Sequence, residues 1–340
     1  MDSDRTKAND PGLLRLLVGD GRPLLALTGL ALLFSGGFAL FLAARREFLP
    51  HDIRYLGMSA DALCAIGGCR VADFMFHDRV AFGGTLIAVG TLYLWLAALP
   101  LRRGEPWAWW TFLFSGSLGF LSFLSYLGFG YLDDWHGVGT AALLPVFVAG
   151  LVLTARRLGP AGWLASPRVL RVPGDAPPWT SAAGVGRALL VATAAGMIAA
   201  GLVILAVGTT WVFVPQDLTF MGMTADELRA VNPRLVPLIA HDRAGFGGGL
   251  LSSGALVLGC VWCAAPSRSL WQALAVAGAA GFGCAIGVHF VVGYRDASHL
   301  LPAFAGAALF ACGMALSYVP MTGAVPTRTA ARRTSAGTAR

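Results

Sequence analysis

The sequence predicts an all-α polytopic membrane protein of about eight transmembrane helices, arranged as two parallel four-helix repeats. Three observations lead to this prediction. The chain is 56% hydrophobic with a mean hydropathy of +0.67, only 13% of its residues are charged, and its charge-free runs are long. Soluble domains carry about 25% charged residues. Because the whole chain has about half that share, most of it cannot face water.

The charge-free runs have the length of membrane-spanning helices. A helix needs roughly 20 residues to cross about 30 Å of hydrocarbon. Only helices and closed barrels satisfy their backbone polar groups there, and the runs lack the alternation of barrel strands. We therefore expect helices in the runs, which cover residues 23–44, 80–101, 106–132, 137–155, 188–216, 244–267, 269–294 and 300–327.

The positions of the basic residues predict the orientation. Arg and Lys concentrate in the N-terminal tail, at 102–103, in the segment 156–187, at Arg268 and in the C-terminal tail, and eight crossings place all of these on one side. By the positive-inside rule that side is the cytoplasm. We expect a multi-pass protein of the cell (plasma or inner) membrane with both termini cytoplasmic. The net charge of +7 then reflects orientation rather than binding of nucleic acid.

Three sequence blocks occur twice. Residues 57–63 (GMSADAL) match 222–228 (GMTADEL), residues 77–84 (HDRVAFGG) match 241–248 (HDRAGFGG), and residues 130–136 (GYLDDWH) match 293–299 (GYRDASH). The offset changes only from 165 to 163 residues along the chain. An even number of crossings per unit gives both units the same orientation, related by an axis along the membrane normal.

These repeats divide the chain into five segments. We expect a cytoplasmic tail (1–22), a first four-helix repeat (23–157), a Pro-rich cytoplasmic linker (158–186), a second repeat (187–320) and a disordered tail (321–340). In the outer loop of the second repeat, Thr224 and Glu227 have the spacing of a capping box, which predicts a short helix from about Ala225. Cys64 and Cys69 lie in the matching loop and are candidates for a small disulfide. Cys260 and Cys263 fall inside a hydrophobic run and are expected to be packing residues.

The histidines suggest where chemistry takes place, because all six map to the outer half of the membrane. Imidazole and carboxylate groups bind Zn²⁺, and imidazole also suits Cu and Fe, so a transition metal such as zinc, iron or copper is a candidate cofactor. Haem is a weaker candidate, because it usually takes two histidines buried within facing helices. The candidate metal ligands are His77, Asp133, His136, His241, Asp296 and His299, with His51 and His289 as possible extra ligands.

Arginines beside these residues suggest a second kind of ligand. Arg79, Arg243 and Arg295 are expected at headgroup depth, where they could bind a quinone or the anionic head group of another lipid-like small molecule in the bilayer. Asp78 and Asp242 point away from the neighbouring histidines and are expected to pair with an Arg or to support a ligand. Asp52 and Asp217 are expected to be loop or capping residues.

Several functions remain open. The preferred hypothesis is a membrane protein with a His/Asp-lined site at the outer face of each repeat, which binds a metal or redox cofactor. The alternatives are a secondary transporter or channel with a His/Asp proton relay, and a non-catalytic anchor or partner subunit. A simpler interpretation of the same blocks is that they cap helices and form salt bridges. The sequence contains no Walker motif, nucleophile elbow or HExxH, so it names no reaction and no protein partner.

Overall fold

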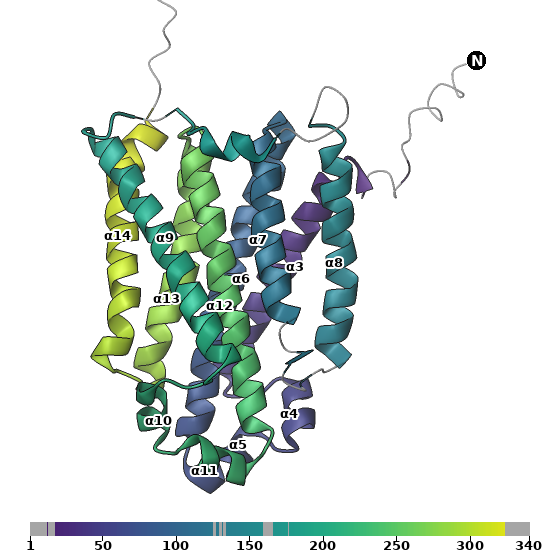
Figure 1. The fold of residues 1–340 in the computed structure, drawn as a ribbon, viewed down its shortest axis with the longest axis vertical. Coiled ribbons are helices and arrows are strands. Elements are labelled where there is room, and N and C mark those ends of the chain that lie inside the picture. The colour runs from purple at the N-terminus through teal and green to yellow at the C-terminus, as the bar shows by residue number, and fades with distance from the viewer. Residues whose placement is uncertain are drawn as a thin grey trace, which may run out of the picture.

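The computed structural model describes residues 12, 18–124, 127–128, 131, 134–158, 166–175 and 177–323, with the side chains of 67 and 134–136 left aside. Within these residues, eight helices are long and apolar enough to cross a membrane, and they run side by side (Figure 1). The chain is therefore a multi-pass membrane protein. The long helices are α3 (Arg22–Ala44), α6 (Arg70–Ala98), α7 (Pro106–Leu124), α8 (Asp134–Ala155), α9 (Ala182–Thr209), α12 (Leu235–Cys263), α13 (Arg268–Val292) and α14 (Ala297–Thr322).

Short helices close one end of the bundle. They are α4 (Pro50–Leu56), α5 (Ala60–Gly67), α10 (Pro215–Met221) and α11 (Ala225–Val231), and they lie together at the lower end of Figure 1. Two 3₁₀ helices, η1 (Leu101–Arg103) and η3 (Pro167–Arg171), lie in connections of the opposite end. We call the end with the short helices the capped end and the opposite end the linker end.

Local sequence signals explain why the short helices form. The Thr224 side chain accepts a hydrogen bond from the Glu227 backbone N–H, and the Glu227 carboxylate accepts one from the Thr224 N–H, which confirms the predicted capping box and the start of α11 at Ala225. The Ser59 side chain caps α5 by accepting a hydrogen bond from the Ala62 backbone N–H. Gly57 and Gly222 end α4 and α10 with φ of +70° and +69°, a left-handed conformation that glycine adopts without steric cost.

The helices that carry the HDRxxFGG blocks form the centre of the bundle. Among the long helices, α6 and α12 are the most buried, and they contact one another. Helix α6 also packs on α3 and α13, while α12 packs on α9 and α7. Helices α8 and α14 lie against α3 and α9, respectively. Residues 22–155 and 182–322 thus contain the same order of long and short helices and the same pairings, although their common origin by duplication stays a prediction.

The glycines of these blocks allow the close packing. A Cβ added to Gly84 would collide with Cys284 of α13, and a Cβ added to Gly248 would collide with Ser122 of α7. The preceding glycines, Gly83 and Gly247, approach the backbones of α3 and α9. Small residues let membrane helices approach one another closely. The second glycine of each block therefore brings its helix against a helix of the opposite half.

Some boundaries differ from those expected. Helix α6 begins at Arg70, well before the charge-free run at residue 80, so His77 is inside a helix rather than at its opening. Charged groups that pair with one another can be buried within a helix bundle, and a charge-free run then underestimates the helix. The segment expected as linker contains η3 and the start of α9 at Ala182. Cys64 and Cys69 form a disulfide, which confirms that candidate pair. Cys260 and Cys263 are buried and not disulfide-bonded.

Candidate functional site

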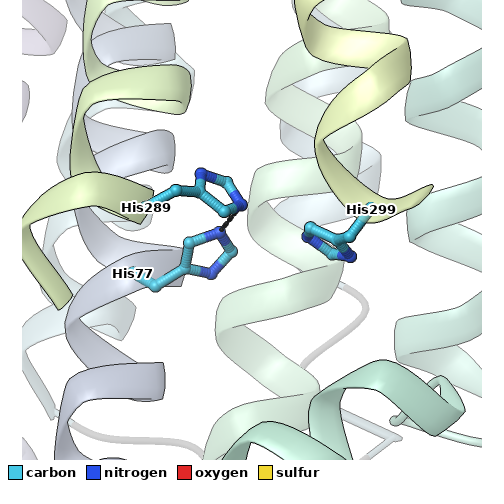
Figure 2. A group of neighbouring side chains, drawn as sticks. All are labelled: His77, His289 and His299. Atoms are coloured by element: carbon cyan, nitrogen blue, oxygen red, sulfur yellow. Dashed lines mark hydrogen bonds between the residues drawn. The ribbon is translucent and has the colours of Figure 1, made fainter. Parts of the chain in front are cut away.

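Three histidines from three helices meet near the capped end. His77 of α6, His289 of α13 and His299, in the first turn of α14, each offer a ring nitrogen, and these atoms lie within 4.8 Å of one another. Figure 2 shows the three rings turned toward a common point. The shortest approach, 3.0 Å, is between Nε2 of His77 and Nε2 of His289. His77 and His289 are buried and His299 is partly buried, so water has limited access to the group.

The contacts of the other ring nitrogen indicate how two of these rings are protonated. Nδ1 of His289 lies 2.7 Å from the carbonyl oxygen of Ala285. A carbonyl only accepts hydrogen bonds, so this Nδ1 carries the hydrogen. Nδ1 of His77 lies 3.0 Å from a carboxylate oxygen of Asp78. An ionised carboxylate also only accepts hydrogen bonds, so this Nδ1 carries the hydrogen as well. Neutral His77 and His289 rings therefore both present a lone pair at Nε2.

The third ring is oriented by a tyrosine. The Tyr294 hydroxyl donates to a carboxylate oxygen of Asp217 over 2.8 Å and lies 3.3 Å from Nδ1 of His299. Burial, and then the nearby Asp217 carboxylate, raise the pKa of Tyr294 well above its usual value, so the hydroxyl keeps its hydrogen. Because that hydrogen is directed to Asp217, the hydroxyl oxygen accepts from Nδ1 of His299. Nε2 of His299 then also carries a lone pair.

The consequence is a concentration of electron lone pairs. Each Nδ1 is held by a carboxylate, a backbone carbonyl or a hydroxyl, which leaves a lone pair on Nε2 of each neutral imidazole. Ring nitrogens of the three residues lie within 4.8 Å of one another, and Nε2 of His77 and Nε2 of His289 are 3.0 Å apart. Two acceptors 3.0 Å apart repel one another unless a cation, either a proton or a metal ion, lies between them. Histidines that ligate metals almost always donate their other N–H to such partners, which fixes the ring orientation. The arrangement has the form of a three-histidine metal site.

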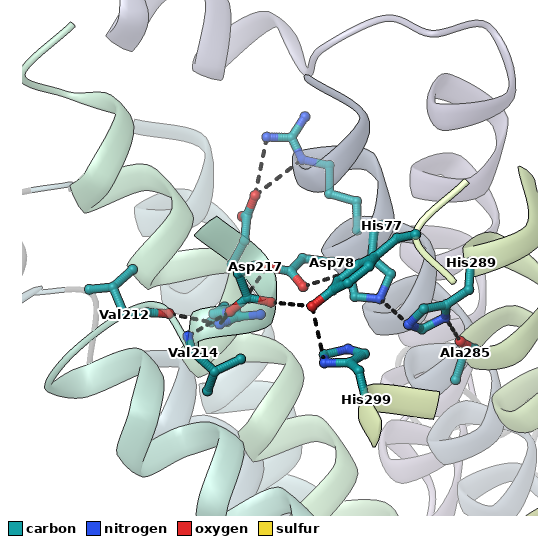
Figure 3. A network of polar contacts seen from close by, with 12 residues as sticks. His77, Asp78, Val212, Val214, Asp217, Ala285, His289 and His299 are labelled. Carbon is teal, nitrogen blue, oxygen red and sulfur yellow. Dashed lines mark hydrogen bonds and ion pairs between the residues drawn. The ribbon is translucent and has the colours of Figure 1, made fainter. Parts of the chain in front are cut away.

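Buried ion pairs surround this cluster. The Arg243 guanidinium contacts Asp217 at 2.5 Å and Asp78 at 3.4 Å, and it donates to the Val212 carbonyl over 2.8 Å. Asp217 also accepts from the backbone N–H of Val214 and so caps the start of α10 (Figure 3). Asp217, Asp78 and Arg243 are almost wholly buried. The carboxylates that hold Tyr294 and His77 are thus both fixed by one arginine.

The first half contains a matching set of ion pairs. Arg79 contacts Asp52 at 2.5 Å and Asp242 at 3.3 Å, and the Tyr131 hydroxyl donates to Asp52 over 2.6 Å. His241 lies in this set, with its ring centroid 5.0 Å from that of Tyr131. Each arginine therefore pairs with one aspartate of its own half and one aspartate of the other half.

The structure brings some of the predicted metal ligands together and separates others. His77, His289 and His299 come together, but they come from both halves rather than from one repeat. The helices that carry the HDRxxFGG blocks, α6 and α12, each pack against a helix of the opposite half. The period of a helical sequence does not reveal which helices become neighbours. His241 is buried elsewhere, as is His51, whose Nε2 lies 3.6 Å from Asp52. Asp133 and the side chain of His136 lie outside the described residues.

The remaining candidates support the site or lie at its edge. Asp296 accepts from the backbone N–H of His299 and from the Ser298 hydroxyl, so it caps α14 and is not part of the histidine cluster. These hydrogen bonds, that of the Ser298 side chain first, lower the pKa of Asp296. Arg295 is exposed and its guanidinium lies over the Phe290 ring, 5.6 Å from the centroid. Arg79 and Arg243 each lie between two carboxylates.

Sequence reasoning missed the roles of two aspartates and two tyrosines. Asp52 and Asp217 were expected to be loop or capping residues. Asp217 does cap α10, but each aspartate is also a buried partner of an arginine. Tyr131 and Tyr294 were not singled out. The signal was available, because both Pro-x-Asp and Gly-Tyr occur at matching places in the two halves. These aspartates lie on the short helices α4 and α10 and are buried there, and that burial cannot be read from the local pattern.

An apolar cavity leads away from the histidines. It has a volume of about 680 Å³ and is lined by α6, α9, α12, α13 and α14. His77, His289 and His299 lie at its capped end, and its walls continue toward the linker end with side chains such as Leu92, Leu274 and Phe310. Val203 of α9 also lines the cavity and is 62% exposed, so the cavity reaches the lipid-facing surface of the bundle.

Comparison with protein-family models, with curated proteins and with solved structures gives no match. Function is therefore argued from the site itself.

Proposed function

We propose that this membrane protein binds one transition-metal ion at His77, His289 and His299. The observation that carries the proposal is that one ring nitrogen from each of the three histidines lies within 4.8 Å of the others, with the two Nε2 atoms of His77 and His289 3.0 Å apart, while each Nδ1 has its own partner. Nitrogen–metal distances of about 2.0–2.1 Å place two ligands of a tetrahedral ion about 3.3 Å apart. The separation of 3.0 Å between His77 and His289 is close to that value.

The ligand type limits the ion. Imidazole nitrogens suit zinc, copper and iron, whereas magnesium and calcium prefer oxygen ligands. Three protein ligands on a tetrahedral ion leave a fourth position for water or substrate, as in catalytic zinc sites. The surrounding residues would orient the ligands: Asp78 holds His77, and the pair of Tyr294 and Asp217 holds His299.

The cavity indicates the class of molecule that would reach the open position. Its walls are apolar and it meets the lipid-facing surface, so a lipid-like amphiphile could enter from the bilayer with its polar group at the histidines. A quinone or a lipid with a long apolar tail fits this description. This proposal makes the cavity part of the functional site.

Metal analysis of the protein purified in detergent tests the metal proposal. We expect about one ion of zinc, copper or iron per chain, lost in His289→Ala and in His299→Ala. His241→Ala is the matched control, because His241 is equally buried but does not belong to the cluster. Metal-free wild type, or equal metal loss in the His241 control, would overturn the proposal.

A proton-relay function is the second candidate, and a specific observation favours it. The hydrogen-bonded series Asp217–Tyr294–His299 approaches His77, which contacts Asp78. A proton between the facing nitrogens would also satisfy their lone pairs. Proton flux in proteoliposomes that is lost in His77→Ala, together with a metal-free wild-type protein, would favour this alternative over the metal site.

A further inference from the structure

A buried arginine lies at the linker end, far along the helices from the histidines. Arg187 is in the second turn of α9 and is 8% exposed. Its Nε and Nη2 donate to the carbonyls of Val261 and Trp262 over 3.1 and 2.6 Å, at the C-terminal end of α12. The guanidinium lies 5.1 Å from the centroid of the Trp262 ring. These contacts hold the guanidinium in one place but do not neutralise its charge.

No carboxylate within the described residues pairs with Arg187, and its Nη1 is buried without a hydrogen-bond partner. The matching position in the first half shows what is missing. Gly186-Arg187-Ala188-Leu189-Leu190 corresponds to Gly21-Arg22-Pro23-Leu24-Leu25, and there Arg22 contacts the Asp20 carboxylate at 2.7 Å. A buried cation without a partner anion is costly. Arg187 therefore needs an anion from outside the described chain.

A cavity beside Arg187 provides room for that anion. It has a volume of about 410 Å³ and lies between the linker-end parts of α9, α12, α13 and α14. Beyond Arg187, its walls are mostly apolar, with Leu190, Leu270 and Met321 among them. Asp175 lies on its lining, but this residue is exposed and forms no ion pair with Arg187. The cavity thus combines one fixed positive charge with apolar walls.

We propose that this cavity binds the phosphate head group of a membrane lipid with a net negative charge, with Arg187 as the charged anchor. Guanidinium groups bind phosphate oxygens through charge-assisted hydrogen bonds, and Nη1 is available for one. Basic pockets between the ends of transmembrane helices suit lipid head groups. The apolar walls favour a lipid over free phosphate, because they would contact the first methylenes of an acyl chain. The site is independent of the metal proposal.

Thermal unfolding of the full chain in detergent tests this site. Phosphatidylglycerol, phosphatidylcholine and inorganic phosphate are added separately to the wild type and to three variants. Arg187→Gln removes the charge but can still donate to the α12 carbonyls. Ala183→Phe fills the cavity and leaves the arginine in place. Arg268→Gln is the control, since Arg268 is exposed at the same end.

We expect phosphatidylglycerol to raise the melting temperature of the wild type and of Arg268→Gln more than phosphatidylcholine does. Its apparent affinity should fall about tenfold or more in Arg187→Gln, in line with the loss of one charged hydrogen bond. The affinity should also fall in Ala183→Phe, because the added ring occupies the space of the lipid. An equal shift with inorganic phosphate would keep the anion site but exclude the lipid as its source. No difference between the two lipids, or the same stabilisation in Arg187→Gln, would overturn the proposal and leave Arg187 as a cap for α12.

Discussion

Replacing Tyr294 by Phe separates the metal site from the stability of the fold, because the chain contains a matched control. Tyr294 and Tyr131 are both almost wholly buried, and the hydroxyl of each donates to a buried aspartate. Phe keeps the ring and its packing in both cases. Within the described residues, the hydroxyl of Tyr294 alone also contacts a member of the histidine cluster, Nδ1 of His299.

The expected sizes of the effects follow from these contacts. Each substitution removes a hydrogen bond to an ionised carboxylate, which contributes about 1.5–3 kcal/mol. The free energy of unfolding of metal-free protein should therefore fall by similar amounts in Tyr294→Phe and Tyr131→Phe. Loss of a group that orients a metal-bound histidine typically weakens metal binding about 10- to 100-fold. Tyr294→Phe should show this loss, and Tyr131→Phe should bind the metal like the wild type.

The assay has two parts. Denaturant unfolding of metal-free protein in detergent measures stability, and titration against a chelator of known affinity measures metal binding at equal folded fraction. If both variants lose the same metal affinity, the effect comes from the fold and the assigned role of Tyr294 is wrong. If neither loses affinity, His299 is not oriented through its Nδ1, and the argument for the lone pair at its Nε2 fails.

Three further predictions follow from the same geometry. Asp217→Asn and Asp52→Asn each leave a buried arginine with one carboxylate fewer, so both should lower the free energy of unfolding by about 3–5 kcal/mol. Metal titration should detect weaker binding only in Asp217→Asn. Gly281→Phe places a side chain in the apolar cavity, whereas the control Gly283→Phe places one in open space. Mass spectrometry should find that a co-purified amphiphile is lost only from Gly281→Phe, while both variants retain the metal. Removing the ion with a chelator should lower the melting temperature of the wild type but not of His289→Ala, because only a protein that binds the ion is stabilised by it.

The membrane helices could be predicted because their signal is local. Every charge-free run overlaps one long helix of the structure, and Thr224 and Glu227 formed the predicted capping box. These features depend on residues within a few turns of one another. The starts of α6 and α12 were harder to predict, because the polar His-Asp-Arg residues two turns into each helix are packed between other helices.

The histidine cluster could not be predicted in full because it depends on which helices are neighbours. The repeats grouped His77 with residues of its own half, whereas α6 packs on α13 and brings His77 to His289. The cause lies partly in Gly84, whose missing side chain lets α13 approach. A glycine indicates that some helix is close, but it does not identify that helix.

The comparison of the two halves also suggests which polar residues are structural and which are functional. The pairs Arg79–Asp242 and Arg243–Asp78 connect the halves, and each half has its own aspartate and tyrosine in support. Such a network, present twice, fixes how α6 and α12 cross. The third histidine of the cluster is different, because His289 corresponds in the alignment of the halves to Tyr126, which has a phenol in place of an imidazole. The scaffold present in both halves thus carries a set of three histidines where α6 of the first half meets α13 and α14 of the second. This is why substitutions of matching residues should have equal effects on folding and unequal effects on metal binding.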